Sequence, residues 1–406
     1  MKNNTINRRL RKNLPDNTIY NSQVASIIVA VGFAFKLSAA PGIISESFDS
    51  STLWVFLLFT LVDVVCAIFT FAFSRMNGDV LLVATKNKFY KVCCFLASLW
   101  LTTKTTFYFC YCMSYLSHEL FTGVQPVLIY MVFLLPVAYL GNKGTRTIAR
   151  SAEVFALLCV FTIVLNLAFL DANLDVGRNL PIFSLPPSEF FAKSLRYGLW
   201  LGDLFPFAFV RIRNKKMPYV SLTMAFVWAL VNLIVMLGVA LYGNALKMVS
   251  DLLIRIASFN QLSLEIGRME WTNLFLIITI SILSMSFLYD GANKAFARAT
   301  GSALPCRIFC PLAVLVVSLG VTSTQSVTDF ALGELGYVLF ALAVALPVLV
   351  TTTALVQKRK YPRIYACLDD EYMPYSSLLC SPDSANDGKL KSCAQKKDCV
   401  QRSENP

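Results

Sequence analysis

Apolar runs long enough to cross a membrane recur along most of this chain, with short polar segments between them. A helix of roughly 20 apolar residues spans the hydrocarbon core of a bilayer. Ten such runs are present, at residues 23–45, 53–73, 92–116, 125–140, 147–170, 190–210, 217–242, 271–293, 308–323 and 335–356. The pattern therefore predicts an all-α, multi-pass membrane protein with ten transmembrane helices.

The distribution of charge supports this number of spans and predicts an orientation. Alternate loops carry 23 Lys and Arg residues, whereas the opposite loops carry only 4. Basic loops stay on the cytoplasmic side, so both termini are predicted to be cytoplasmic. Only 15% of the residues are charged and the mean hydropathy is +0.60, which is membrane composition. The net charge of +12 therefore reflects basic loops and does not indicate a nucleic-acid partner.

The chain is predicted to have three parts, a basic segment at 1–19, a membrane domain at 20–357 and a polar tail at 358–406. The basic start followed by an apolar run could be a secretory signal, but Pro41 and the even number of spans argue against cleavage. The tail holds Cys367, Cys380, Cys393 and Cys399. In the cytoplasm these thiols stay reduced, and their spacing fits no zinc pattern.

The sixth span contains a glycine, a carboxylate and a proline at its centre, in the order Gly202, Asp203 and Pro206. Such a break is tolerated in a membrane only where the freed backbone groups face protein or a water-filled cavity. The first span is also interrupted by glycine and proline, between Gly32 and Gly42. Broken helices at corresponding positions of two five-helix halves indicate an inverted repeat with a central ligand site.

Four charged residues fall near the middle of predicted spans, namely Lys36, Asp63, Lys104 and Asp203. Each costs about 2.5–3.5 kcal/mol at the centre of a membrane helix unless it is paired. One interpretation is structural pairing, either Lys36 with Asp203 and Asp63 with Lys104, or the crossed arrangement. The other is that at least one of them contacts substrate or relays a proton, with Asp63, Lys104 and Asp203 as coupling candidates.

Two further patterns have local interpretations. Arg150 and Glu153 lie three residues apart at the start of the fifth span, which predicts a structural ion pair on the helix surface. Between the seventh and eighth spans, residues 243–270 have apolar positions at helical spacing with charges between them. This predicts an amphipathic interfacial helix or a lid over the central site, with a plain surface helix favoured.

The usual motifs of metal hydrolysis, ATP hydrolysis and acyl transfer do not occur. The single histidine, His118, is predicted to be a solvated loop residue. The sequence therefore predicts a protein that is not an enzyme and that needs no metal and no cofactor. Among the aromatic residues, Tyr108, Trp200 and Phe205 are candidates for lining a pocket.

Several segments together resemble the B subunits of endospore germinant receptors (GerAB-like permeases), within the amino acid–polyamine–organocation superfamily. The resemblance covers about residues 20–357. It rests on GTRTIARSAEVF at 144–155, NLPIF at 179–183, LGDLFPFAF at 201–209 and IGRMEWTNLFLIITI at 266–280, in that order.

The resemblance implies a LeuT-like fold with a 5+5 inverted repeat. It also implies that the protein senses a small nutrient, commonly an amino acid, together with A- and C-type partner subunits in the spore inner membrane. The ligand pocket that it implies is formed by the first, third, sixth and eighth spans, at Gly32, Phe33, Lys36, Lys104, Tyr108, Gly202, Asp203, Phe205 and Ser284. A ligand bound between Lys36 and Asp203 would be zwitterionic. A secondary amino acid transporter coupled to a proton or cation is the alternative.

Overall fold

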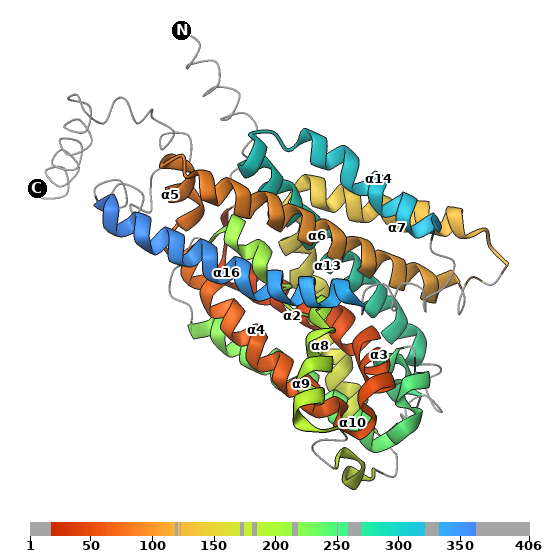
Figure 1. Cartoon of the computed structure of the whole chain (residues 1–406). Coiled ribbons are helices and arrows are strands. Elements are labelled where there is room, and N and C mark those ends of the chain that lie inside the picture. Colours follow the sequence, from red (N-terminus) through yellow and green to blue (C-terminus); the bar gives the residue numbers. More distant parts are fainter. Residues whose placement is uncertain are drawn as a thin grey trace, which may run out of the picture.

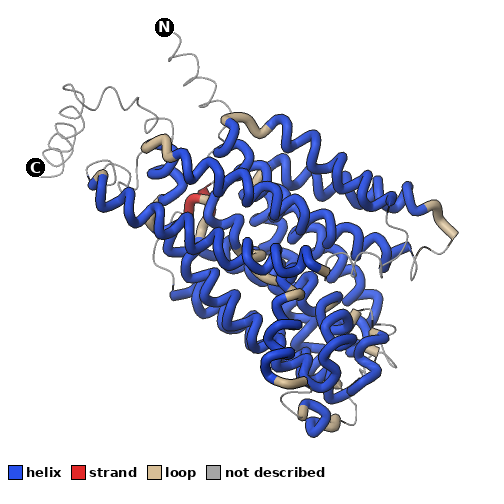
Figure 2. Tube along the Cα trace, viewed as in Figure 1, coloured by secondary structure: helices blue, strands red, loops and turns tan. Residues whose placement is uncertain are grey.

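The structure is a computed structural model that describes residues 18–117, 121, 123–170, 174–180, 185–212, 218–249, 251–258, 269–320 and 333–362. Within these ranges almost all of the backbone is helical (Figure 2). The prediction of an all-α chain is therefore confirmed. The basic segment up to residue 17, His118, and the cysteine-containing tail from residue 363 lie outside the described residues.

The first half of the chain supplies six long helices and a short one. They are α2 (Asn21–Leu37), α3 (Ala39–Phe48), α4 (Thr52–Arg75), α5 (Gly78–Ala84), α6 (Lys88–Tyr115), α7 (Pro126–Lys143) and α8 (Thr145–Ala168), with the 3-10 turn η1 (Asp49–Ser51) before α4. The second half contains η3 (Val176–Asn179), α9 (Pro187–Leu195), η4 (Gly198–Trp200), η5 (Phe205–Phe209), α10 (Pro218–Tyr242), η6 (Gly243–Met248), α11 (Leu252–Ala257), α13 (Met269–Thr300), α14 (Leu304–Gly320) and α16 (Glu334–Lys360).

The first apolar run coincides with the broken pair α2 and α3, the sixth with α9 and the 3-10 turns η4 and η5, and each of the others with one long helix. Six helical stretches of the described residues are long and apolar enough to cross a membrane, and α2 and α14 are shorter apolar helices. The number of ten crossings therefore stays a prediction. Several helices extend beyond their apolar runs, and α13 continues to Thr300, past the predicted end of the eighth span near residue 293.

The long helices lie side by side and form one bundle (Figure 1). Helix α2 runs through its interior and packs against α8, α10 and α13. Only three of its 17 residues escape burial, so this helix contacts protein on almost every side. Its high content of Val, Ile, Ala and Phe is what allows a helix to be buried all round.

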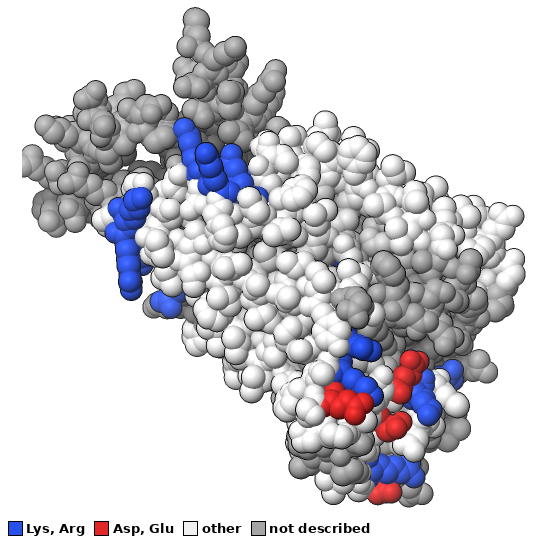
Figure 3. All heavy atoms as spheres, in the orientation of Figure 1, with Lys and Arg blue, Asp and Glu red and all other residues white. Residues whose placement is uncertain are grey.

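The outer surface of the bundle is apolar in its middle. Several large side chains there are more than 60% exposed, as expected for groups that contact lipid. They include Leu61, Leu135, Leu157, Phe161 and Leu222. On the face in Figure 3, Lys and Arg gather near α5 and the end of α16, a white band follows, and mixed charges lie at the opposite end. We refer to the end that holds α5 and Lys358–Lys360 as the basic end.

A short parallel pairing joins the two halves of the chain. Strand β1 (Thr18–Ile19), just before α2, pairs with β2 (Arg211–Ile212), just after η5. The Ser74 hydroxyl, at the end of α4, also donates a hydrogen bond to the carbonyl of Val210 (3.1 Å). The approaches to the first span and the exit of the sixth are therefore bound to one another.

The described part of the segment after α10 consists of the turn η6 and the short helix α11, and residues 250 and 259–268 lie outside the described residues. An amphipathic helix or a lid over residues 243–270 therefore stays a prediction. The apolar positions Leu246, Leu252 and Ile256 are buried against the protein. The segment packs against α3, where a methyl group added at Gly42 would come within 2.3 Å of a backbone oxygen.

Helix α16 approaches the broken sixth span closely at a glycine, which gives a first prediction. A Cβ atom at Gly336 would lie 2.0 Å from the carbonyl oxygen of Arg196. Since backbone cannot move aside as a flexible side chain can, Gly336→Ala should lower the free energy of unfolding by about 1–3 kcal/mol. Thermal unfolding in detergent measures this. Gly320→Ala is the matched control, because no atom lies within 4 Å of its Cβ position.

If both glycine variants unfolded at the temperature of the parent protein, the close contact between α16 and the sixth span would be wrong. A loss confined to Gly336→Ala would support it.

Asp251, in the segment that covers α3, gives a second prediction. Burial raises the pKa of its carboxyl group from 3.8 to about 7, although Ile254 N–H and Arg255 partly oppose the shift. In the unfolded chain the group loses its proton near pH 4, while in the folded protein it keeps it until about pH 7. Stability should therefore fall as pH rises between these values and level off above them.

The measurement is the unfolding temperature against pH for the parent protein and for Asp251→Asn. The amide also caps a helix well, so the variant keeps the cap at α11. It should show a flatter profile between pH 4 and 7. Equal slopes in the two proteins would contradict the prediction.

Candidate functional site

The first and sixth spans are both broken, but to different extents. In the first span, α2 ends at Leu37 and α3 begins at Ala39, so the interruption is a single residue, Ser38. In the sixth span, Leu201 is extended and Gly202 has a φ of +75°, a conformation that glycine adopts without strain. Residues 196–209 contain no α-helix, so many backbone groups lack helical partners there.

The four central charges lie together beside this break. Lys36 pairs with Asp63 and lies 3.7 Å from Asp203 Oδ2, and Lys104 Nζ lies 2.5 Å from Asp203 Oδ1. Every one of these side chains is at most 5% exposed. Of the two pairings open from the sequence, the structure has the crossed one, with an added contact between Lys36 and Asp203. We call Lys36, Asp63, Lys104 and Asp203 the charge cluster.

The charge cluster also binds the freed backbone of the sixth span. Lys104 Nζ donates a hydrogen bond to the carbonyl of Leu201, and Asp63 Oδ1 accepts one from the N–H of Gly202 (2.8 Å). The hydroxyl of Tyr108 lies 3.2 Å from the carbonyl oxygen of Leu199 and 3.0 Å from Asp203 Oδ1. The polar groups that a helix would have satisfied internally are thus satisfied by side chains from α4 and α6.

Aromatic rings enclose the charge cluster. Tyr108 stacks between Phe35 and Trp200, with ring centroids 4.0 Å and 5.7 Å away. Lys36 Nζ lies 3.8 Å from the ring centre of Trp228, a cation–π contact. These rings exclude water and lower the local dielectric, which strengthens each ion pair and makes any unpaired charge costly.

Three indole N–H groups beside this site, those of Trp100, Trp200 and Trp228, have no hydrogen-bond partner among the described residues, and these residues are at most 6% exposed. The hydroxyl of Ser284, on α13, is 1% exposed and also has no such partner. Trp100 lies beside Gly202 and Phe205, Trp200 beside Tyr108, and Trp228 beside Lys36. Native proteins satisfy nearly all buried polar groups, so these donors have the capacity to bond to acceptors of a bound molecule.

The remaining predicted ligand residues have packing roles in the described structure. Gly32 faces Val227, whose side chain would lie 2.5 Å from an added Cβ, and Phe33 is part of the buried core. Phe205 packs edge-on against Trp100 and Phe209, with centroids 5.7 Å and 5.5 Å apart. Among the described residues, none of the three makes a hydrogen bond or an ion pair with a side chain of the charge cluster.

The predicted ion pair between Arg150 and Glu153 is not among the ion pairs of the described residues. Arg150 is exposed, whereas Glu153 Oε1 accepts a hydrogen bond from the Ser22 hydroxyl on α2 (3.3 Å). Glu153 therefore contacts α2 while Arg150 lies at the surface, which spacing along one helix could not reveal.

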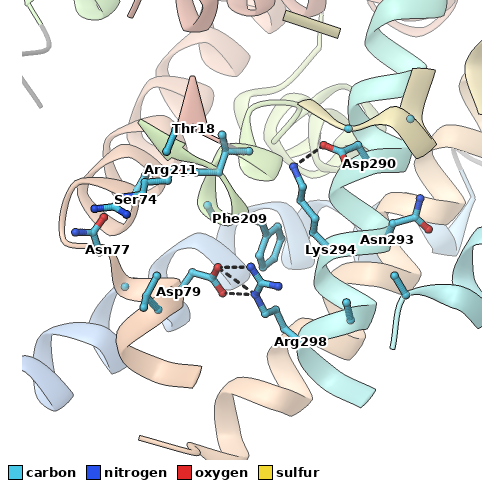
Figure 4. Close-up of a pocket in the computed structure, with 18 of the residues that line it drawn as sticks. Thr18, Ser74, Asn77, Asp79, Phe209, Arg211, Asp290, Asn293, Lys294 and Arg298 are labelled. Carbon is cyan, nitrogen blue, oxygen red and sulfur yellow. Dashed lines mark hydrogen bonds and ion pairs between the residues drawn. The ribbon is translucent and has the colours of Figure 1, made fainter. Parts of the chain in front are cut away.

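A cavity lies away from the charge cluster, toward the basic end (Figure 4). Two buried ion pairs line it: Arg298 with Asp79, and Lys294 with Asp290. Arg298 donates from both Nε and Nη2 to Asp79, and Lys294 also contacts Thr145. The eighth apolar run ends at residue 293, so Lys294 and Arg298 were predicted to lie in the loop that follows it, whereas both lie on α13. The spacing of Asp290, Lys294 and Arg298, four residues apart each time, was the signal of one helix face.

The fold has counterparts among solved structures, although no family model matches the sequence and no curated protein matches it significantly. Mhp1, a nucleobase-cation-symport-1 family transporter with bromovinylhydantoin bound, aligns with a TM-score of 0.52 at 11% identity, over 90% of this chain and 96% of Mhp1. MhsT in complex with L-phenylalanine aligns with a TM-score of 0.53 at 14% identity, over 84% of this chain and 99% of MhsT. The chain therefore has the LeuT fold of these multi-pass transporters, as the resemblance implied.

Proposed function

We propose that the protein binds a small zwitterionic nutrient at the charge cluster, as the permease-like subunit of a germinant receptor. The observation that supports this most directly is the charge balance of the site. Two lysines and two aspartates, all at most 5% exposed, face one another beside an irregular backbone segment. A ligand with one positive and one negative group can exchange partners with these residues and leave the site neutral. An anion or a cation would add an unpaired buried charge.

The contacts suggest how such a ligand binds. Its carboxylate takes a position beside Lys36 or Lys104, where Asp203 now lies, and its amino group takes a position beside Asp203 or Asp63. The unpartnered indole and hydroxyl donors supply further hydrogen bonds to ligand oxygen atoms. The two aligned structures each hold a small molecule, which is consistent with a nutrient of this size.

Ligand binding and the conformation of the sixth span are linked through the same atoms. Asp63 and Lys104 hold the backbone at Gly202 and Leu201, so a ligand that recruits either residue weakens that hold. In a receptor, the resulting movement passes to A- and C-type partner subunits. We place the basic end at the cytoplasmic face, by the positive-inside rule. The membrane is that of an endospore former, either the spore inner membrane or the cell membrane.

A secondary transporter for an amino acid is the second candidate, because the same site holds groups that exchange protons. Lys36 contacts both Asp63 and Asp203, and Lys104 contacts Asp203, so the four groups form one chain of ion pairs. One proton transfer neutralises a buried ion pair. In that case release of the ligand to one side of the membrane accompanies proton or cation movement.

The role of Asp203 is tested by ligand binding. A panel of proteinogenic amino acids is screened by thermal shift, and the apparent Kd of the best ligand is obtained from the shift at increasing concentration. We expect Asp203→Asn to raise this apparent Kd by about tenfold or more, as for the loss of a charge-assisted hydrogen bond. Glu153→Gln, which removes a carboxylate outside the site, should leave the response unchanged. Equal responses of the two variants would show that the site is not at Asp203.

Loss of Asp203 also leaves Lys104 without its carboxylate, so the fold needs its own control. The double variant Lys104→Gln with Asp203→Asn removes one charge of each sign and restores the balance. It should unfold at a higher temperature than Asp203→Asn while still failing to respond to the amino acid. A double variant that bound normally would contradict the assignment.

Uptake separates the two candidate functions. Purified protein in proteoliposomes is given the labelled amino acid that binds best, with and without a pH gradient. Binding without accumulation supports the receptor subunit. Accumulation that depends on the gradient supports the transporter. Genes for A- and C-type subunits beside this gene would favour the receptor independently.

A further inference from the structure

The segment that follows α10 reaches the break in the first span. Ser38 is the single residue between α2 and α3, and its carbonyl accepts a hydrogen bond from the N–H of Leu252, the first residue of α11 (3.5 Å). Leu252 also packs on α10, since its side chain would lie 2.8 Å from a Cβ added at Gly238. We call the described residues between Gly243 and Ser258 the cover segment.

The cover segment lies against α3 through its backbone. The carbonyl oxygens of Val249 and Leu246 would lie 2.3 Å and 3.6 Å from a Cβ added at Gly42, so the absence of a side chain there permits this close approach. Ser38 itself follows Lys36 of the charge cluster by two residues. The cover segment therefore contacts the first span directly beside the central site.

A buried carboxylate lies where the cover segment meets the break. Asp251 directly precedes Leu252 and is 4% exposed, and its side chain accepts a hydrogen bond from the N–H of Ile254 at the start of α11 (3.2 Å). Among the described residues it forms no ion pair with a cation. Arg255, the next basic residue along the chain, is exposed.

The titratable groups around Asp251 give its negative charge little support. From α6, Tyr111 and Cys112 interact with it electrostatically, and both side chains are neutral near pH 7. Further groups in this region are Glu46 on α3, which interacts with Tyr111, and Tyr242 on α10, which interacts with Arg255. Arg255 and the backbone N–H groups of α11 only partly oppose the effect of burial, so the pKa of Asp251 is raised to about 7.

We propose that Asp251 makes the docking of the cover segment on the first span depend on pH. While its carboxyl group is protonated, the segment stays docked on α3 and on the carbonyl of Ser38. Ionisation favours a displaced segment in which the carboxylate is hydrated, because a buried charge without a cation is costly. Displacement takes the partner of the Ser38 carbonyl away, two residues from Lys36. Acid therefore closes this approach to the charge cluster, and neutral pH loosens it.

The position of α3 identifies the solution whose pH matters. Helix α3 lies at the end of the bundle opposite α5 and the basic end (Figure 1). Since we place the basic end at the cytoplasmic face, Asp251 responds to the pH outside the cell. Docking is a property of the protein without a ligand, so it can be tested independently of the proposed function.

The size of the effect follows from two protonation equilibria. A hydrated Asp251 ionises near pH 4 and the docked residue near pH 7, so docking is strongest below the first value and weakens until the second. Between them, the ratio of displaced to docked protein rises by up to about tenfold for each pH unit. Above pH 7 the ratio levels off, because both states are then ionised.

Hydrogen–deuterium exchange of the full-length protein in neutral detergent, without ligand, measures this docking. Exchange of peptides from residues 243–258 is followed at pH 5 and pH 7, and each rate is divided by the intrinsic rate at that pH. Protection in the parent protein should fall by about tenfold or more between the two values. In Asp251→Asn, whose neutral amide keeps the cap of α11, protection should stay at the parent's pH 5 level. A parent profile independent of pH would overturn the proposal.

Asp175→Asn is the matched control. Asp175 caps η3 as Asp251 caps α11, but its side chain is 61% exposed. This variant should retain the pH dependence of the parent. Equal flattening by both variants would show an effect of surface charge and refute the role of Asp251. Lower protection in Asp251→Asn than in the parent at pH 5 would mean that a neutral group does not favour docking, which also contradicts the proposal.

Discussion

The irregular backbone of the sixth span can persist inside the bundle only because other groups complete its hydrogen bonds. Asp63 accepts from Gly202, Lys104 donates to Leu201, and Tyr108 lies against Leu199. Charged side chains here replace the internal hydrogen bonds of a helix. The same residues neutralise one another in pairs, so backbone satisfaction and charge balance depend on one set of atoms. Neither can change without the other.

This dependence gives the central site an unusual property for a binding pocket, since its charged groups are already paired without a ligand. An entering molecule must replace contacts that the protein makes with itself. Binding is then an exchange, and its net free energy is a small difference between two well-paired states. Selectivity follows from that difference, because a ligand with mismatched charge forfeits pairs that it does not restore.

Much of this arrangement could be predicted from the sequence, for reasons that are physical. A charge in the middle of an apolar run must find a partner, so Lys36, Asp63, Lys104 and Asp203 were expected to meet, and they do. Which lysine pairs with which aspartate could not be predicted, because both arrangements balance the charge and depth along a helix does not distinguish them. The donors of Trp100 and Trp228 were missed because a tryptophan that packs and one that awaits a ligand look alike in a sequence. Asp79 and Arg298 are 219 positions apart, beyond the reach of any local pattern.

The two-residue pairing of β1 with β2 has a mechanical consequence. It ties Thr18 and Ile19, at the entrance to the first span, to Arg211 and Ile212, at the exit of the sixth. At this end the two interrupted spans are therefore held together, although Ile19 and Arg211 are 192 positions apart along the chain. A displacement of either span would therefore act on the same pair of strands at the basic end, and through it on the other span.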